Sequence, residues 1–379
     1  MTAAFEPPPT VWEAIDGRRG RAGAHPGGAI DLTIGTPVDD PPGFVADVLA
    51  RAGGARGYPP SVGTARFRTA AAGWVARRFG VEVPPEQVAA SMGSKELVAG
   101  LPHWLRLRRP DRDTVLHPAV AYPTYAMGAR LAGCRAVPVP AGPDGALDLA
   151  AVDPADAARA LGLWSNSPGN PTGALDDLAA AAAWGRAHDV PVLSDECYTE
   201  LTWDGPPRTI LAHGLDGVLA VHSLSKRSNL AGLRVGFYAG DAELVAYLSQ
   251  LRKHAGCMVA GPVQEVAAVA LDDDGHAAAQ RATYRRRLDV VRAALGSAGL
   301  PAPEPGGAFY LWLPAPGGDG AAWADWWADE LGTLVTPGGA YGPAGEGHVR
   351  LALVAPDDRV DELARRLAAR AGAASGPAA

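Results

Sequence analysis

The sequence is poor in cysteine and contains no long hydrophobic run. Only Cys134, Cys197 and Cys257 occur among its 379 residues, and no two of them form a C-x-x-C pair. Such a set favours neither a disulfide framework nor a zinc cluster, and it fits a reducing cytosol. No segment approaches the roughly 18 apolar residues of a membrane span, and the N-terminal residues lack the apolar core of a signal peptide. These absences predict a soluble cytoplasmic protein with no membrane partner.

An excess of positive charge is also absent. The chain has 34 basic and 41 acidic residues, a net charge of -7, so nucleic acid is not an expected partner. The nine histidines form no H-E-x-x-H motif and no cluster with acidic residues, and we predict no metal site. The glycine-rich motifs of dinucleotide and P-loop nucleotide sites are missing as well.

Lysine is scarce, since only Lys95, Lys226 and Lys253 stand among the 34 basic residues. Arginine supplies the positive charge elsewhere, so a lysine that persists can serve as a neutral primary amine, which arginine cannot offer. Three surviving lysines do not by themselves show which one matters. The surrounding sequence has to decide.

What the sequence does contain is the pattern of an α/β protein. Hydrophobic residues make up 47% of the chain, and its length suits two domains. Short apolar runs alternate with longer helical stretches, which is typical of βα units and a mostly parallel sheet. The predicted strands are 114–116, 135–139, 161–165, 191–194, 217–222 and 234–239. The predicted helices are 64–79, 94–107, 123–132, 174–188 and 242–255.

The pattern changes after about residue 270, which predicts a second, smaller α+β domain. Its predicted elements are a helix over 277–298, a strand over 308–313, a helix over 321–331, a strand over 348–354 and a helix over 357–371. We therefore predict a large domain over 41–270. The small domain would combine 271–379 with 1–40, which includes an N-terminal arm.

Three predicted strands are followed at once by chemically capable residues. NSPGNPTG follows residue 165, DECY follows residue 194, and SLSKRSN begins after residue 222. Because ligands gather at the carboxyl ends of parallel strands, these segments are predicted to form one site.

Lys226 lies in the last of these segments, with Ser223, Ser225 and Arg234 nearby. A lysine amine beside hydroxyls and an arginine suits a Schiff base to an aldehyde cofactor whose phosphate needs donors. A surface lysine in a serine-rich loop is the plainer alternative. The segment also spells S-x-x-K, the motif of penicillin-recognising enzymes, but no K-T-G follows and the serine closes a strand instead of opening a helix.

The other two segments offer partners for such a cofactor. Asp195 can keep a pyridine nitrogen protonated, although a carboxylate there can equally cap the next turn. Tyr198 and Asn170 can donate to a ring oxygen, and Tyr122 can stack on an aromatic ring. Ordinary packing and turn formation are the alternatives for these three residues.

Two further features point to anionic ligands. Gly93, Ser94 and Lys95 precede a helical stretch, so their N–H groups can face an anion at a helix start, although a plain helix start explains them as well. Arg350 alternates outward from an apolar strand, and an arginine there usually pairs with a carboxylate of the substrate or of the protein.

Together these motifs resemble the fold-type-I pyridoxal-phosphate aminotransferases of class I/II. The resemblance extends from DLTIGTP at residue 31 to HVRLAL at residue 348, in the order and spacing of that family. It implies an aspartate aminotransferase-like α/β fold, with a large cofactor-binding domain and a smaller α+β domain. It also implies an enzyme that transfers an amino group between an amino acid and a 2-oxo acid, working as a homodimer with shared active sites.

The resemblance further implies a role for each motif residue. Lys226 would form the Schiff base with pyridoxal 5'-phosphate and carry the proton, with Asp195 and Tyr198 as the other catalytic residues. The substrate α-carboxylate would be held by Gly35, Asn170 and Arg350. The implied cofactor-binding residues are Gly93, Ser94, Lys95, Tyr122, Asn170, Asp195, Tyr198, Ser223, Ser225, Lys226 and Arg234, with Tyr58 reaching the phosphate from the neighbouring subunit.

Narrower features resemble the succinyldiaminopimelate aminotransferases of lysine biosynthesis, namely SLSKRSNLAG, RKHAGCMVAGPVQ, GSKELV and AVAYPTYAMGA. They imply N-succinyl-2,6-diaminopimelate and 2-oxoglutarate as substrates, with Arg56, Arg227 and Arg252 available for a distal carboxylate or simply solvated. Another class I/II aminotransferase or a carbon–sulfur β-lyase would use the same cofactor residues, so both alternatives stay open. A pyridoxal-phosphate transcription regulator is not favoured, because no helix-turn-helix pattern precedes the fold.

Overall fold

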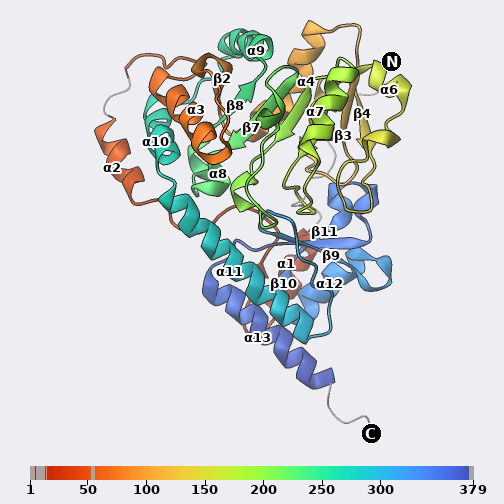
Figure 1. The fold of residues 1–379 in the computed structure, drawn as a ribbon. Coiled ribbons are helices and arrows are strands. Elements are labelled where there is room, and N and C mark those ends of the chain that lie inside the picture. Colours follow the sequence, from red (N-terminus) through yellow and green to blue (C-terminus); the bar gives the residue numbers. More distant parts are fainter. Residues whose placement is uncertain (1–4, 6–12, 14, 53–55, 375–379) are drawn as a thin grey trace. The chain divides into compact units, whose positions relative to one another are not determined.

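The computed structural model describes residues 5, 13, 15–52 and 56–374 (Figure 1). The chain divides into a large unit, Thr36–Tyr284 with Pro305–Ala308, and a small unit, Met1–Gly35 with Arg285–Glu304 and Phe309–Ala379. The domain boundaries that the sequence predicts, after residues 40 and 270, remain a prediction. Much of the predicted N-terminal arm (1–4, 6–12 and 14) lies outside the described residues.

A seven-stranded sheet forms the centre of the large unit, in the order β2-β8-β7-β6-β5-β3-β4. Only β8 runs antiparallel to its neighbours, and every other neighbouring pair is parallel, which confirms the predicted mostly parallel sheet. The strands are β2 (Val88–Ser91), β3 (Thr114–Pro118), β4 (Arg135–Val139), β5 (Ala160–Asn166), β6 (Val192–Asp195), β7 (Val218–Ser223) and β8 (Gly236–Gly240).

Helices cover both faces of this sheet (Figure 1). One face packs on α3 (Ala65–Phe79), α7 (Leu178–Ala187) and α10 (Gly261–Asp272), which itself contacts α2 (Phe44–Arg51). The other packs on α4 (Ser94–Arg108), α5 (Thr124–Leu131) and α9 (Ala242–His254). Successive strand residues alternate between the two cores, as Val192 and Leu193 do in β6. A sheet covered on both faces needs the nearly continuous apolar strands that the sequence displays.

The predicted helices and strands of the large unit lie close to their observed positions, except that α7 and β8 begin later than predicted, α7 at Leu178 instead of residue 174. Strand β8 begins at Gly236, two residues later than predicted, because Arg234 adopts a left-handed conformation with φ 53°. The sequence analysis missed α2, α6 (Pro154–Ala158), α10 and β2. The β2 sequence VAAS is short and rich in alanine, so it carries little strand propensity.

The small unit contains an antiparallel sheet in the order β11-β12-β9 and a separate parallel pair, β1 with β10. These strands are β1 (Ile30–Asp31), β9 (Tyr310–Pro314), β10 (Thr333–Leu334), β11 (Thr336–Pro337) and β12 (His348–Ala352). Its helices are α1 (Asp16–Gly23), α12 (Gly320–Leu331), α13 (Asp357–Ala374) and the later part of α11 (Gly275–Ser297). Among all the helices described in either unit, none is long and apolar enough to cross a membrane.

Candidate active site

The register of the large sheet brings the predicted cofactor residues to one edge. Ser91 at the end of β2 pairs with Gly236, which also pairs with Ser223 at the end of β7. In the next strands Asp195 pairs with Val221, and Asn166 pairs with Asp195. The loops that leave these strand ends are therefore neighbours, as expected for the ligand-binding edge of an open α/β sheet.

Lys226 lies on the short helix α8 (Leu224–Arg227), directly after β7. Ser223 caps this helix, because its Oγ accepts a hydrogen bond from the backbone N of Ser225 at 3.2 Å. The Lys226 side chain is half-buried. Burial raises the pKa of both Asp195 and Cys197, and the positive charge of Lys226 opposes each rise, which places the amine within electrostatic reach of both groups.

Asp195 is the last residue of β6, and its side chain is 5% exposed. Burial raises the pKa of this carboxyl, while hydrogen bonds from Cys197 and Tyr125 and the charge of Lys226 oppose the rise. The Tyr125 hydroxyl donates to Asp195 Oδ2 at 2.8 Å, and the Cys197 N–H donates to Oδ1 at 3.2 Å. A buried carboxylate held in this way favours a cationic partner.

Tyr125 is a residue that the sequence analysis missed. It lies on α5, it is fully buried, and its ring stacks on Trp164 with centroids 4.9 Å apart. AYPTY contains two tyrosines, and only Tyr122 was selected from it. No local signal in this segment distinguishes Tyr125 from Tyr122, because the contact of Tyr125 with Asp195 is made across 70 residues of chain.

Asn166 is a second missed residue, and it organises the loop after β5. Its Nδ2 donates to the backbone oxygen of Asp195 at 2.9 Å, and its Oδ1 accepts from the backbone N of Asn170 at 2.8 Å. Asn170 and Tyr198 are 8% and 6% exposed, so both predicted ring-oxygen donors are buried. We call Asp195, Tyr125, Asn166, Asn170 and Tyr198 the ring end of the site.

The residues predicted to bind phosphate include Gly93, Ser94 and Lys95 at the start of α4 and Arg234 just before β8. Gly93 precedes α4 with φ 75°, and a Cβ at this position would overlap the guanidinium of Arg234. Arg234 is exposed, and it donates to the backbone oxygens of Ala231 at 2.9 Å and Met92 at 3.3 Å. Lys95 Nζ lies 6.0 Å from the centroid of the Tyr122 ring.

A helix start, hydroxyl groups and a guanidinium are the donors that bind phosphate oxygens. The structure supplies them on adjacent strand ends, and glycine leaves the backbone accessible beside Arg234. We call this set, Gly93, Ser94, Lys95, Ser223, Ser225 and Arg234, the phosphate end. The residues present thus fit a cofactor with a protonated ring at one end and a phosphate at the other.

Arg350 belongs to the small unit, and its environment differs from the expected one. Its side chain is 5% exposed and does not point outward from β12 as the sequence predicted. The guanidinium lies 4.3 Å from the ring centroid of Tyr310 and 4.8 Å from that of Tyr341, and it donates to the Thr33 backbone oxygen. Gly35 also adjoins Tyr310, because a Cβ on Gly35 would overlap the tyrosine hydroxyl.

Two of the arginines offered for a distal carboxylate are already engaged. Arg227 and Arg252 are 5% and 1% exposed, and Arg252 forms an ion pair with Glu96. The prediction that they are available or solvated is wrong, whereas Arg56 is exposed. Tyr58, predicted to act on a neighbouring subunit, is 96% exposed. Over the described ranges, no three His, Cys, Asp or Glu residues gather as metal ligands.

Comparisons with known proteins agree on one family. The family described as "Aminotransferase class I and II" matches residues 28–367. The chain is 43% identical to the 4-dedimethylamino-4-oxo-anhydrotetracycline transaminase OxyQ of Streptomyces rimosus, over 96% of this chain and 99% of that protein. It is 35% identical to the LL-diaminopimelate aminotransferase of Gloeobacter violaceus, over 96% of each chain.

A solved structure supports the same relationship. A probable N-succinyldiaminopimelate aminotransferase from Thermus thermophilus superposes with a TM-score of 0.85 and 31% identity, covering 95% of this chain and all of the other. The mutual similarity extends over both units of the chain.

Proposed function

Because the chain belongs to the class I and II aminotransferases, whose cofactor is pyridoxal phosphate, we propose that Lys226 is the amine that binds the cofactor aldehyde. The observation that carries this proposal is the placement of Lys226 beside a buried carboxylate. Asp195 ends β6 and Lys226 follows β7, the neighbouring strand, and the positive charge of Lys226 opposes the rise that burial causes in the pKa of Asp195.

The ring end suits the chemistry of transamination. When bound, pyridoxal phosphate supplies an electron-accepting ring that stabilises negative charge on the substrate Cα. Asp195 would hold the ring nitrogen protonated, and Asn170 and Tyr198 would donate to the ring oxygen. Lys226 would then take the proton from the substrate Cα and return it, acting as the general base and acid.

The phosphate end would hold the cofactor, and Arg350 would hold the substrate. Gly93, Ser94, Ser223, Ser225 and Arg234 would bind the phosphate. Arg350 would bind the substrate α-carboxylate as a guanidinium–carboxylate pair, with the backbone at Gly35 beside it.

A homodimer is part of the same proposal. A tyrosine side chain that is 96% exposed contributes no packing to its own chain, and Tyr58 is free to reach the phosphate of a neighbouring subunit. The paucity of cysteine supports a cytoplasmic location for this dimer.

For the substrates we propose N-succinyl-2,6-diaminopimelate and 2-oxoglutarate, in lysine biosynthesis. The named function of the Thermus thermophilus structure supports this choice. The relatives named LL-diaminopimelate aminotransferases favour free LL-diaminopimelate as a second candidate, which has the same carbon skeleton without the succinyl group. The OxyQ relative favours a polycyclic ketone as the amino-group acceptor, a third possibility.

The test is single-turnover absorbance spectroscopy of the purified, cofactor-loaded protein with separate amino donors. Glutamate, N-succinyl-LL-2,6-diaminopimelate and LL-diaminopimelate are compared at equal concentrations. We expect all the cofactor to react with glutamate and with the succinylated compound. Reaction with free LL-diaminopimelate alone among the two pimelates would transfer the assignment to the second candidate, and reaction with glutamate alone would discard both.

A separate assay decides between a transaminase and a carbon–sulfur β-lyase. Cystathionine is supplied without a 2-oxo acid. A transaminase converts at most one equivalent of amino donor per site under these conditions, since it has no acceptor. Continuous release of pyruvate and ammonia would instead establish the lyase.

A further inference from the structure

Arg227, the residue after Lys226, is one of the most buried arginines of the large unit. Its side chain is 5% exposed, and its Nη1 donates to the backbone oxygen of Ala270 on α10 at 2.9 Å. The guanidinium carbon lies 5.5 Å from the centroid of a Trp74 ring on α3. Helix α8 is thus attached to two of the helices that cover one face of the sheet. A buried charge adds nothing to solubility and is costly to desolvate, so the presence of Arg227 beside Lys226 needs another reason.

Glu200 connects Arg227 to the segment that carries Tyr198. Arg227 Nε lies 3.7 Å from Glu200 Oε1, and Glu200 belongs to helix η3 (Thr199–Leu201), which begins immediately after Tyr198. Trp74 Nε1 donates to Glu200 at 3.0 Å, and Arg78 donates to both of its oxygens at 3.2 and 2.8 Å. Burial lowers the pKa of Arg227, and the nearby Glu200 carboxylate opposes this change.

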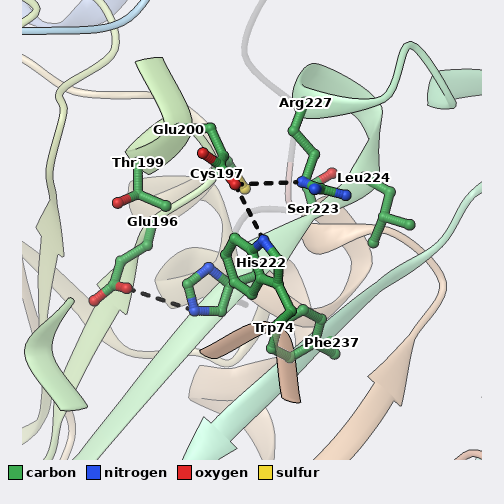
Figure 2. Close-up of a pocket in the computed structure, with 10 residues that line it drawn as sticks. All are labelled: Trp74, Glu196, Cys197, Thr199, Glu200, His222, Ser223, Leu224, Arg227 and Phe237. Carbon is green, nitrogen blue, oxygen red and sulfur yellow. Dashed lines mark hydrogen bonds and ion pairs between the residues drawn. The ribbon is translucent and has the colours of Figure 1, made fainter. Parts of the chain in front are cut away.

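A small cavity of about 10 Å³ lies between the two segments, which is close to the room that one water molecule needs (Figure 2). It is lined on one side by Glu196, Cys197, Thr199 and Glu200, and on the other by His222, Ser223, Leu224 and Arg227, together with Trp74 and Phe237. Five buried polar atoms of its lining have no hydrogen-bond partner within the described part of the chain. They are Oε2 of Glu196, both ring nitrogens of His222, and Nε and Nη2 of Arg227. Several of them take part in longer ion pairs, since His222 Nε2 is 3.5 Å from Glu196 Oε2 and Arg227 Nη2 is 3.9 Å from Asp274 Oδ1.

We propose that Arg227 is a positioning residue for Lys226. Through Glu200 it joins the helix that follows β7 to the helix that follows Tyr198, and an ordered water in the cavity completes this junction. The junction fixes the backbone of α8, and so the direction in which the neighbouring Lys226 amine leaves it. The inference rests on the proposed role of Lys226, and it adds a second layer of residues that do not touch cofactor or substrate.

The test compares Arg227→Met with Arg112→Met. Arg112 is a matched control: it is 8% exposed in the same unit, and it donates to the backbone oxygens of Ala160 and Asp189 at 2.9 and 2.6 Å. Arg112 precedes β3, so it lies near the amino ends of the parallel strands, whereas Lys226 follows the carboxyl end of β7. Both variants remove a buried guanidinium, so both are expected to lower the melting temperature.

The discriminating readouts are kcat against KM with glutamate, and hydrogen exchange of peptides that cover residues 223–230. For Arg227→Met we expect kcat to fall about 10-fold or more, as misplacement of a reacting group does. KM should change less than about threefold, since substrate binding groups are untouched. Exchange over 223–230 should accelerate. Arg112→Met should leave kcat and this exchange as in the native protein.

A fall in melting temperature for Arg227→Met with native kcat and exchange would overturn the proposal. If that variant does not fold, Glu200→Gln is the second test, because it keeps the side chain's size and removes only the charge that faces Arg227. It should lower kcat in the same direction.

The proposed function is checked separately by borohydride reduction of the native, cofactor-loaded protein, followed by peptide mass spectrometry. A label on a lysine other than Lys226 would contradict the assignment of Lys226. It would leave open whether Arg227 fixes the backbone of α8, which hydrogen exchange tests independently.

Discussion

The ring end and the phosphate end of the site are built in opposite ways. At the ring end, Asp195, Asn166 and Tyr125 are buried, and each is fixed by hydrogen bonds within the protein. At the phosphate end, Arg234 is exposed, and the site is shaped by backbone conformation, with φ 75° at Gly93 and φ 53° at Arg234. One end depends on side-chain networks, and the other on backbone groups and an accessible charge.

The difference follows from what each end has to do. A carboxylate that must keep a ring nitrogen protonated needs a low dielectric and fixed partners, and its raised pKa shows the cost of burying it alone. A phosphate keeps its charge in water and needs only donors that converge on it. Substitutions at the ring end should therefore affect turnover, and those at the phosphate end should affect cofactor affinity.

The largest effect is expected for Lys226→Ala. Without the amine no group is placed to move the Cα proton, so turnover should fall by at least about 10⁴-fold while the fold is kept. The assay is glutamate–2-oxoglutarate exchange, with circular dichroism to verify folding. Lys253→Ala is the matched control, since Lys253 is exposed on α9. Substantial residual turnover in Lys226→Ala would contradict the assignment.

Asp195→Asn should have the next largest effect. The amide retains the shape and can still accept from Tyr125, but it cannot stabilise a protonated ring nitrogen. We expect kcat to fall about 100- to 1,000-fold, the scale of losing one buried electrostatic contact to the reacting system. The ratio of affinities for pyridoxal phosphate and pyridoxal should stay native. A change in that ratio would show that the two ends are not separable.

Arg234→Ala should produce the converse result. Loss of charge-assisted hydrogen bonds worth about 1.5–3 kcal/mol corresponds to a roughly 10- to 100-fold weaker affinity for pyridoxal phosphate. Affinity for pyridoxal, which has no phosphate, should be nearly unchanged, and kcat at saturating cofactor should fall much less than for Asp195→Asn. Equal weakening for both compounds would mean that Arg234 does not act on the phosphate.

The sequence predicted the strands and the functional residues at their ends because both depend on local sequence pattern. Continuous apolar runs predicted β3 to β7 closely, and the polar residues that follow them are the ones that register brings together. It could not reach contacts that depend on packing across the sheet. Arg227 and Arg252 look like solvated arginines in the sequence, and only the fold shows that each is buried against a carboxylate.

Tyr125 was missed for the same reason. It is 70 residues from Asp195 in the chain, and nothing in the segment AYPTY indicates which tyrosine turns toward β6. A hydrogen bond to a carboxylate on another strand is a property of tertiary structure. The hydrogen bond from Tyr125 to Asp195 is therefore a part of the ring end that only the structure reveals.

The smallest effect, a shift in pH dependence, is expected for Tyr125→Phe. The hydroxyl stabilises the ionised form of Asp195, so its removal should raise the pKa of that carboxyl further. A raised pKa means that Asp195 becomes protonated at higher pH, so the acidic limb of the kcat/KM profile should move to higher pH. Tyr247→Phe is the control and should leave the acidic limb in place, because the Tyr247 hydroxyl donates at 2.9 Å to the backbone oxygen of Trp104 and not to a carboxylate. Since the hydrogen bonds from Cys197 and the charge of Lys226 continue to stabilise the ionised form of Asp195, activity at neutral pH should fall only slightly. An acidic limb that stays in place in Tyr125→Phe would show that burial and the charge of Lys226 alone set the ionisation of Asp195, and that the ring end is held less tightly than its hydrogen bonds indicate.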